Sequence, residues 1–197
     1  MEPMKPRPTL AAFCAALALT CCTPAQTPSV RLKASSVRDL SSLTAPDTRA
    51  VVLVFLASDC TLADRYIPAI QHLDEEFAPK HVRFWIVYPN PTETPELLRI
   101  HREATRQTLP ELLDPDQSLV RLTGVHVTPE AAIFTVKAAQ LHQVYRGRID
   151  DRDISFGKQR SQPTRNDLED AIADAIAGRK VTPPRTGPVG CAIVSKS

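Results

Sequence analysis

The sequence predicts an α/β fold in which a strand–helix–strand half is followed by two adjacent strands and a final helix. Residues 51–56 are six consecutive apolar residues, rich in β-branched types, which is typical of a strand buried on both faces. Residues 82–88 predict a second buried strand. Residues 131–136 and 141–145 predict an antiparallel hairpin.

Length and composition set the limits of this prediction. The 197 residues allow one ordinary domain with tails, and 43% apolar residues are enough for a normal core. A net charge of +2 gives no reason to expect a nucleic-acid partner. The 18 prolines lie mainly at the two ends and between periodic segments. We expect a linker over residues 26–46, a domain over 47–180 and a Pro/Gly-rich arm over 181–197.

The first 25 residues are typical of an export signal. Two positive charges precede an apolar run, residues 10–20, that is too short to span a bilayer comfortably. Cleavage after Ala25 is one interpretation. Residues 19–22 also resemble a degraded lipobox, which would place a lipid on Cys22, and an uncleaved anchor is a third alternative. We expect an exported protein, either periplasmic or membrane-anchored facing the periplasm.

Helical periodicity follows the first strand. Residues 62–77 carry apolar side chains at helical spacing, and Pro68 is expected to kink this helix or mark its first turn. Thr94 followed by Pro95 predicts the start of the next helix. Leu97, Leu98 and residues 100–101 are expected to form its inner face.

The second half contains a helical insert and a final helix. Residues 109–113 predict a short extended piece, which is followed by a short helix ending at Gly124. Thr164 and Asp167 resemble a capping box before an apolar helical stripe, and Gly178 is expected to end that helix. The last segment predicts a flexible or extended tail that carries Cys191.

Cys60 lies where the buried strand hands over to a helix. The first-turn N–H groups and the positive end of the helix dipole stabilise a thiolate at such a place and lower its pKa. The alternative is that Cys60 is a small buried hydrophobe, as free cysteines often are. Its polar neighbours Ser58, Asp59 and Thr61 favour an exposed, functional thiol.

The cysteines divide into two groups. Cys14, Cys21 and Cys22 belong to the signal or its end, and the body keeps Cys60 and Cys191. Two cysteines in an exported domain suggest a pair. The sequence has no Cys-x-x-Cys and no cysteine–histidine cluster with zinc-finger spacing, so we expect neither a metal nor a cofactor.

Residues 124–131 (GVHVTPEA) resemble the cis-proline loop of the thioredoxin superfamily. Pro129 matches that proline, and Cys60 matches the nucleophilic cysteine after the first core strand. The resemblance covers residues 45–178 and implies a thioredoxin-like fold. It also implies a cis Thr128–Pro129 bond beside Cys60, with Thr128 and Pro129 presenting backbone groups to an extended substrate.

Residues 59–66, 145–152 and 189–191 are similar to a group of exported bacterial redoxin-domain, or peroxiredoxin-like, proteins. Two departures from the wider superfamily matter. The second cysteine of thioredoxin-type reductases is replaced by Ala63. The Pro and Thr or Ser that precede a peroxidatic cysteine are replaced by Leu53 and Ala57.

The resemblance implies a thiol–disulfide oxidoreductase in which Cys60 attacks a protein or small-molecule disulfide and Cys191 resolves the product, with an unidentified redox partner. A thiol peroxidase, in which Cys191 could also resolve, and a non-catalytic binding module are the alternatives. Separately, Cys191 could be an idle thiol or pair with another chain. Peroxide chemistry needs polar donors beside the thiolate, for which Thr61, Arg65, Arg121 and Arg146 are candidates by type.

Two further features have both a structural and a functional interpretation. His126, three residues before Pro129, is the histidine expected nearest to Cys60, and a Cys60–His126 copper site is a minor alternative. The charged run over residues 145–153 predicts a solvated loop, with a binding loop as the alternative.

We predict that the mature protein starts near Cys22 or Gln26, because the apolar run is a cleavable signal. Residues up to about Pro46 are then expected to contribute nothing to the core. Mass spectrometry of the exported protein measures the N-terminus directly, and an intact Met1 would contradict this prediction.

Overall fold

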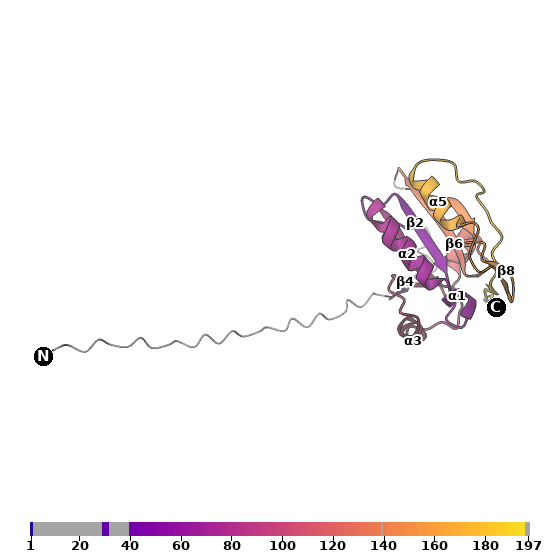
Figure 1. The fold of residues 1–197 in the computed structure, drawn as a ribbon, viewed down its shortest axis with the longest axis horizontal. Helices are drawn as coiled ribbons and strands as arrows, with labels where there is room; N and C mark the ends of the chain where they lie inside the picture. The colour runs from indigo at the N-terminus through magenta and orange to yellow at the C-terminus, as the bar shows by residue number, and fades with distance from the viewer. Residues whose placement is uncertain (2–28, 32–39, 139, 196–197) are drawn as a thin grey trace.

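The computed structural model describes Met1 and residues 29–31, 40–138 and 140–195. The predicted signal, with Cys14, Cys21 and the lipidation at Cys22, lies outside the described residues. Within the described ranges, no helix is long and apolar enough to cross a membrane. Figure 1 shows one folded body with its sheet partly covered by helices.

The elements follow one another in an order that confirms the predicted α/β, thioredoxin-like class. They are β1 (Ser29–Arg31), the 3-10 helix η2 (Leu40–Leu43), β2 (Ala50–Phe55), α1 (Thr61–Asp64), α2 (Ile67–Phe77), the 3-10 helix η3 (Ala78–Lys80), β3 (Val82–Tyr88), α3 (Pro95–Thr105), β4 (Glu111–Leu113), α4 (Ser118–Thr123), β5 (Val127–Thr128), β6 (Glu130–Lys137), β7 (Gln140–Gly147), β8 (Asp153–Ser155), β9 (Lys158–Gln159), α5 (Asp167–Ile176) and β10 (Cys191–Ala192).

The main sheet has the strand order β1-β4-β3-β2-β6-β7. Strand β2 pairs in parallel with β3 and antiparallel with β6, and β6 continues into β7 as the predicted hairpin. The strands β3-β2-β6-β7 with α2 and α5 make up the βαβ–ββα core. The insert between β3 and β6 contributes α3, β4 and α4.

Strand β2 is buried on both faces, as its apolar run predicts. Val52 and Val54 belong to one hydrophobic cluster, into which α2 and α5 insert Ile70 and Ile172. Alternate β2 residues, among them Leu53, belong to a second cluster on the opposite face. This alternation follows from the two-residue period of a strand. Figure 1 shows α2 and α5 side by side over one face of the sheet.

The helix predicted over residues 62–77 is two helices. Helix α1 is a single turn of four residues, and α2 begins at Ile67. Pro68 lies in the first turn of α2, which confirms one of its two predicted positions. The break follows from proline chemistry, because Pro68 has no N–H with which to continue a hydrogen-bonded helix from α1.

Helix α3 begins as predicted. The Thr94 hydroxyl accepts a hydrogen bond from the Leu97 N–H at 3.2 Å, and Pro95 is the first helical residue. Its inner face is narrower than predicted: Leu98 and His101 are buried, whereas Leu97 and Ile100 are 43% and 49% exposed. The prediction for those two residues was therefore wrong.

The predicted capping box at α5 is also wrong. Asn166 precedes the helix and makes no side-chain cap. The Thr164 hydroxyl instead donates to Asp151 Oδ2 at 2.6 Å, and Asp167 accepts from Arg148 Nε at 2.6 Å. Both side chains therefore bond to residues outside the helix, and neither forms the predicted capping box. The helix is followed by Gly178 with φ of +71°, consistent with the predicted stop.

The charged run over residues 145–153 is not the predicted solvated loop. Asp150, Asp151 and Asp153 are all buried. The Tyr66 hydroxyl lies 2.8 Å from an oxygen of Asp150 and 2.9 Å from one of Asp153. These contacts join the segment after β7 to the residue between α1 and α2. Burial raises the pKa of Tyr66, so the phenol keeps its proton for these bonds.

The segment preceding residue 47 contributes to the fold, which corrects the linker prediction. Strand β1 pairs with β4 at the edge of the sheet. Leu43 is 3% exposed and belongs to the second hydrophobic cluster. Its carbonyl accepts a hydrogen bond from Trp85 Nε1 at 3.2 Å. The polar composition of residues 26–46 concealed this anchoring position.

The C-terminal arm follows the edge of β7 instead of hanging loosely. The Arg146 N–H donates to the Pro184 carbonyl at 3.0 Å, and the Thr186 N–H donates to the Arg146 carbonyl at 3.1 Å. The Thr186 hydroxyl also lies 2.7 Å from the Tyr145 hydroxyl. A Cβ at Gly147 would overlap the backbone of Thr186, so glycine permits this close approach.

We predict that Leu43→Ala lowers the free energy of unfolding by about 2–4 kcal/mol, because it removes a buried side chain and leaves a cavity. Leu97→Ala is the matched control: Leu97 is 43% exposed, and a surface change of this kind costs about 0.5 kcal/mol or less. Urea denaturation of both variants measures the difference. Equal, small losses would contradict the assignment of Leu43 to the core.

We predict a pH-dependent contribution from Asp151. The Thr164 hydroxyl, followed by the backbone N–H groups of Thr164 and Arg165, lowers the pKa of Asp151 to about 2. A lowered folded-state pKa stabilises the protein fully above the unfolded value of about 4, and this stabilisation is lost as the pH falls through about 2.

The free-energy difference between the wild type and Asp151→Asn is therefore expected to be largest above pH 5 and to shrink between pH 4 and pH 2. Denaturant titrations across this range measure it. Glu75→Gln, at an exposed position on α2, controls for the loss of one negative charge. A difference that is constant with pH would contradict the role of the ionised Asp151.

Candidate functional site

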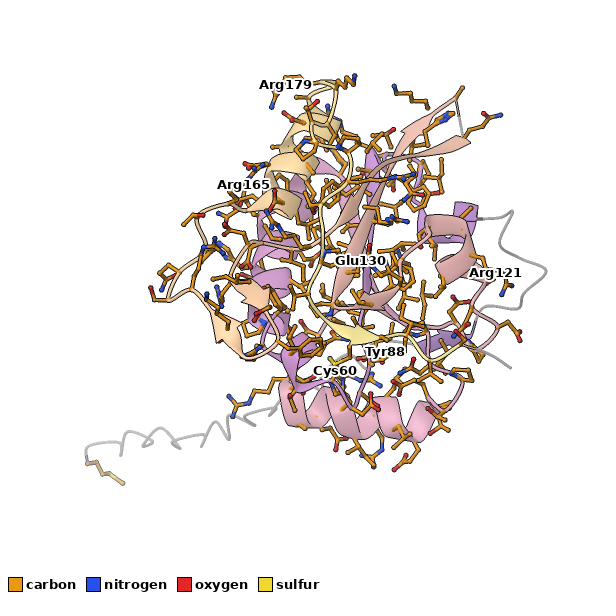
Figure 2. The ribbon with its side chains drawn as sticks, turned by 90° about the vertical axis from the view of Figure 1, so that its right-hand side faces the viewer. Cys60, Tyr88, Arg121, Glu130, Arg165 and Arg179 are labelled. Atoms are coloured by element: carbon orange, nitrogen blue, oxygen red, sulfur yellow. A yellow bond between two sulfur atoms is a disulfide. The ribbon has the colours of Figure 1, made fainter. Side chains whose placement is uncertain are left out.

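The candidate site is centred on a disulfide between Cys60 and Cys191 (Figure 2), which confirms the predicted pair. The two Cα atoms are 6.3 Å apart although 131 positions separate the residues in the sequence. This spacing lies within the range that a disulfide spans. Cys60 is 1% exposed, so the predicted exposure of this residue was wrong: it packs within the first hydrophobic cluster. Cys191, at the start of β10, is half-buried.

The loop before Cys60 is held by a buried carboxylate from another segment. Glu93, between β3 and α3, accepts hydrogen bonds from the Ser58 N–H at 2.9 Å and the Ser58 hydroxyl at 2.7 Å. The Cys60 N–H donates to the Ala57 carbonyl at 3.1 Å. These bonds fix the direction in which the chain leaves β2 and thus position Cys60.

The helix that begins after Cys60 is shorter than the predicted helix whose dipole was expected to lower the pKa of the thiol. Cys60 has extended dihedral angles at the N-cap of α1, which is one turn long and contains Asp64 in its first turn. A macrodipole grows with the number of aligned peptides, so one turn offers a thiolate less stabilisation than the predicted longer helix. Cys60 itself belongs to the first hydrophobic cluster.

The segment on the other side of Cys60 has the predicted geometry. The Thr128–Pro129 peptide bond is cis. The Thr128 carbonyl oxygen lies 3.4 Å from Cys60 Sγ. In the reduced protein the Cys60 thiol can donate to this oxygen. The structure therefore brings together Cys60, Cys191 and the Thr128–Pro129 peptide, the four residues that the sequence predicted as a site.

A buried polar chain lies beneath α1. His101 Nε2 is 2.8 Å from Asp64 Oδ1, and His101 Nδ1 is 2.9 Å from the Tyr88 hydroxyl. A carboxylate only accepts hydrogen bonds, so Nε2 is the donor to Asp64. Burial raises the pKa of Tyr88, which keeps the phenol neutral. The chain connects α1 to α3 and to the end of β3.

The predicted peroxide-polarising side chains have other partners. Arg65 pairs with Asp153 at 3.4 Å, Arg121 donates to the Asp116 carbonyl at 2.7 Å, and Arg146 lies 3.5 Å from Glu130. The fourth candidate, Thr61, is exposed at the start of α1.

His126 does not turn towards the disulfide as expected. Its side chain is 62% exposed and its Nδ1 lies 3.2 Å from Glu130 Oε2. Cys60, by contrast, is buried and oxidised. In the part of the chain that the structure describes, no group of three or more His, Cys, Asp or Glu residues could hold a metal ion. These contacts give no support to the copper alternative.

Two buried amide side chains extend the site, and the sequence reasoning missed both. Asn90 Oδ1 accepts a hydrogen bond from the Val194 N–H at 3.1 Å, and Gln117 Nε2 donates to the Val194 carbonyl. Asn90 follows β3, the parallel neighbour of β2. Because the carboxyl ends of parallel strands meet at one edge, Asn90 could have been placed near Cys60 from sequence. Gln117 carried no comparable signal.

Comparisons with known proteins agree with this architecture. A hypothetical protein from Sinorhizobium meliloti 1021 matches with 23% identity and a TM-score of 0.64, over 77% of this chain and 82% of its own. An uncharacterized conserved protein from Geobacillus kaustophilus matches with 24% identity and a TM-score of 0.62, over 81% and 86%. At these identities the similarity shows the fold alone.

No curated protein matches this sequence. The model of the AhpC/TSA family matches residues 24–144, which is more than half of the chain. The match includes β2, Cys60 and the Thr128–Pro129 peptide, while Cys191 lies beyond it. The chain is therefore a member of the AhpC/TSA family.

Proposed function

We propose that this protein is an exported thiol–disulfide oxidoreductase in which Cys60 is the nucleophile and Cys191 the resolving thiol. The observation that carries the proposal is the disulfide between a cysteine at the end of β2 and one in the C-terminal arm, beside the Thr128 carbonyl. A pair so far apart in sequence can open and close without changing the core, because only the arm has to move.

The reaction transfers two electrons from the reduced cysteine pair to a disulfide. The Cys60 thiolate attacks one sulfur of the substrate, a bond forms between Cys60 and that sulfur, and the second substrate sulfur leaves as a thiolate. The Cys191 thiolate then attacks Cys60 Sγ, which forms the Cys60–Cys191 bond and releases the first substrate sulfur. A dithiol redox partner returns the pair to its reduced form.

Peroxide reduction is the second candidate, and membership of the AhpC/TSA family favours it. In this reaction the Cys60 thiolate takes one oxygen from a peroxide and becomes a sulfenic acid, and Cys191 condenses with it to release water. Ala57 and Leu53 stand where a peroxidatic site is expected to have Thr or Ser and Pro. The three arginine candidates, Arg65, Arg121 and Arg146, have other partners. These features favour disulfide exchange over peroxide chemistry.

A non-catalytic binding module remains the alternative to both reactions. Export supports a redox role, since an oxidising compartment is where a cysteine pair of this kind forms. We place the protein in the periplasm, or at the membrane facing it if Cys22 carries a lipid.

We predict that Cys60→Ser abolishes reduction of insulin disulfides, because it removes the attacking sulfur. Cys191→Ser is expected to keep a reactive Cys60 but to accumulate mixed disulfides, since no thiol releases the product. Turnover of both variants, with mass spectrometry of trapped adducts, measures these effects. Far-UV circular dichroism of the reduced proteins controls for folding.

Consumption of hydrogen peroxide by the wild type, measured in parallel, separates the two reactions. Peroxide turnover without insulin reduction would replace the first proposal by the second. If Cys60 in the reduced protein reacts with neither disulfides nor peroxide, the non-catalytic binding module is the hypothesis that remains.

A further inference from the structure

The last residues of the chain lie as an added strand beside Cys60. Strand β10 pairs antiparallel with β5, with Cys191 opposite Thr128 and Ala192 opposite Val127. The Ile193 N–H continues the ladder by donating to the His126 carbonyl at 3.1 Å. Figure 2 shows this strand crossing the molecule close to Cys60.

Beyond the ladder, the Asn90 and Gln117 side chains form an amide clamp on the chain. Asn90 Oδ1 accepts from the Val194 N–H, and Gln117 Nε2 donates to the carbonyl of the same residue. Both amides are buried, with 5% and 8% of their surface exposed. One acceptor and one donor reproduce the two groups that a neighbouring strand presents. The clamp therefore recognises an extended backbone and is indifferent to the side chain at that position.

The side chains of residues 190–194 meet different constraints. A Cβ at Gly190 would overlap the Thr128 carbonyl, so the position before the cysteine accepts glycine alone without a shift of backbone. Ile193, two positions after the cysteine, packs against the second hydrophobic cluster. Ala192 and Val194 are exposed, the latter by 57%. The surface that holds residues 190–194 thus requires glycine before the cysteine and an apolar residue two positions after it.

A substrate cysteine bonded to Cys60 has to occupy the place of Cys191. Cys60 is 1% exposed and its sulfur faces the Thr128 carbonyl and Cys191. The backbone groups of β5 and the amide clamp are satisfied by the arm in the oxidised protein. When the disulfide is reduced and the arm leaves, Asn90 and Gln117 lose their bonds to Val194, and a second extended chain can replace those bonds.

We propose that β5 and the amide clamp form the recognition site for the substrate, an extended polypeptide with glycine directly before its disulfide cysteine and an apolar residue two positions after it. Residues 190–194 occupy this site as an internal copy of that substrate. The inference rests on the proposed disulfide chemistry and names its substrate class. Resolution is then an exchange of strands: as Cys191 attacks Cys60 Sγ, the arm re-enters the site and the released substrate thiol leaves with its chain.

The test uses the full-length, reduced Cys191→Ser protein and synthetic peptides whose cysteine carries 5-thio-2-nitrobenzoate. Attack by Cys60 forms a protein–peptide disulfide and releases one coloured thiolate. The Cys60→Ser/Cys191→Ser protein keeps Cys14, Cys21 and Cys22, so the rate measured with it is subtracted to give the rate at Cys60. Three peptides share the leaving group: Val-Gly-Cys-Ala-Ile-Val, the same peptide with alanine before the cysteine, and the same peptide with aspartate in place of isoleucine. Free cysteine that carries the same leaving group measures the rate of thiol exchange without contacts to β5 or the amide clamp.

We expect the first peptide to react at least tenfold faster than either altered peptide. Asn90→Ala and Gln117→Ala, made in the same background, should lower the rate for the first peptide. Gln140→Ala, an exposed amide on β7, should not lower it. The three peptides are compared on a protein with an unaltered clamp, so this comparison tests the proposal even if the Asn90→Ala and Gln117→Ala variants fold poorly.

Equal rates for the three peptides, with activated cysteine still reacting, would overturn the recognition site and leave the oxidoreductase proposal intact. Failure of all four probes to react would overturn both.

Discussion

The structure depends on β2 being enclosed on every side. The strand shares hydrogen-bonded ladders with β3 and β6, and its side chains alternate between two hydrophobic clusters. The Leu56 N–H extends the β3 ladder by donating to the Val87 carbonyl at 2.9 Å. A strand paired on both edges cannot change register without breaking both hydrogen-bonded ladders. It therefore delivers Cys60 to one defined place.

The elements around Cys60 are fixed mainly by buried polar contacts between segments distant in sequence. Glu93 holds Ser58, His101 connects Asp64 to Tyr88, and Tyr66 lies between Asp150 and Asp153. A phenol has one proton, so Tyr66 can donate to one of the two carboxylates at a time. Each buried group needs a partner in the native structure. Polar contacts thus orient α1 and α2 on a sheet that apolar burial holds together.

The arm differs from the core in what holds it. Residues 184–186 hydrogen-bond to β7, and residues 191–194 pair with β5 and the Asn90–Gln117 clamp. Backbone hydrogen bonds and one disulfide hold the arm, together with the partly buried side chains of Val189 and Ile193. Any extended chain offers the same backbone donors and acceptors, whereas the packing of Leu53 and Ile70 depends on their side chains. The arm is thus the part of the site that the proposed chemistry at Cys60 requires to move.

The sequence by itself determined the α/β class, the strands over residues 82–88 and 131–145, the helix start at Thr94, and the pairing of Cys60 with Cys191. These features follow from local patterns: apolar periodicity, capping, proline placement and cysteine count. Only the tertiary structure decided that Leu43 joins the core and that the Thr164 hydroxyl bonds to Asp151 instead of capping a helix. It also decided that Asp150, Asp151 and Asp153 are buried. It also placed Gln117 against the arm. Each depends on a partner far away in sequence, and a single sequence carries no local signal for such a partner.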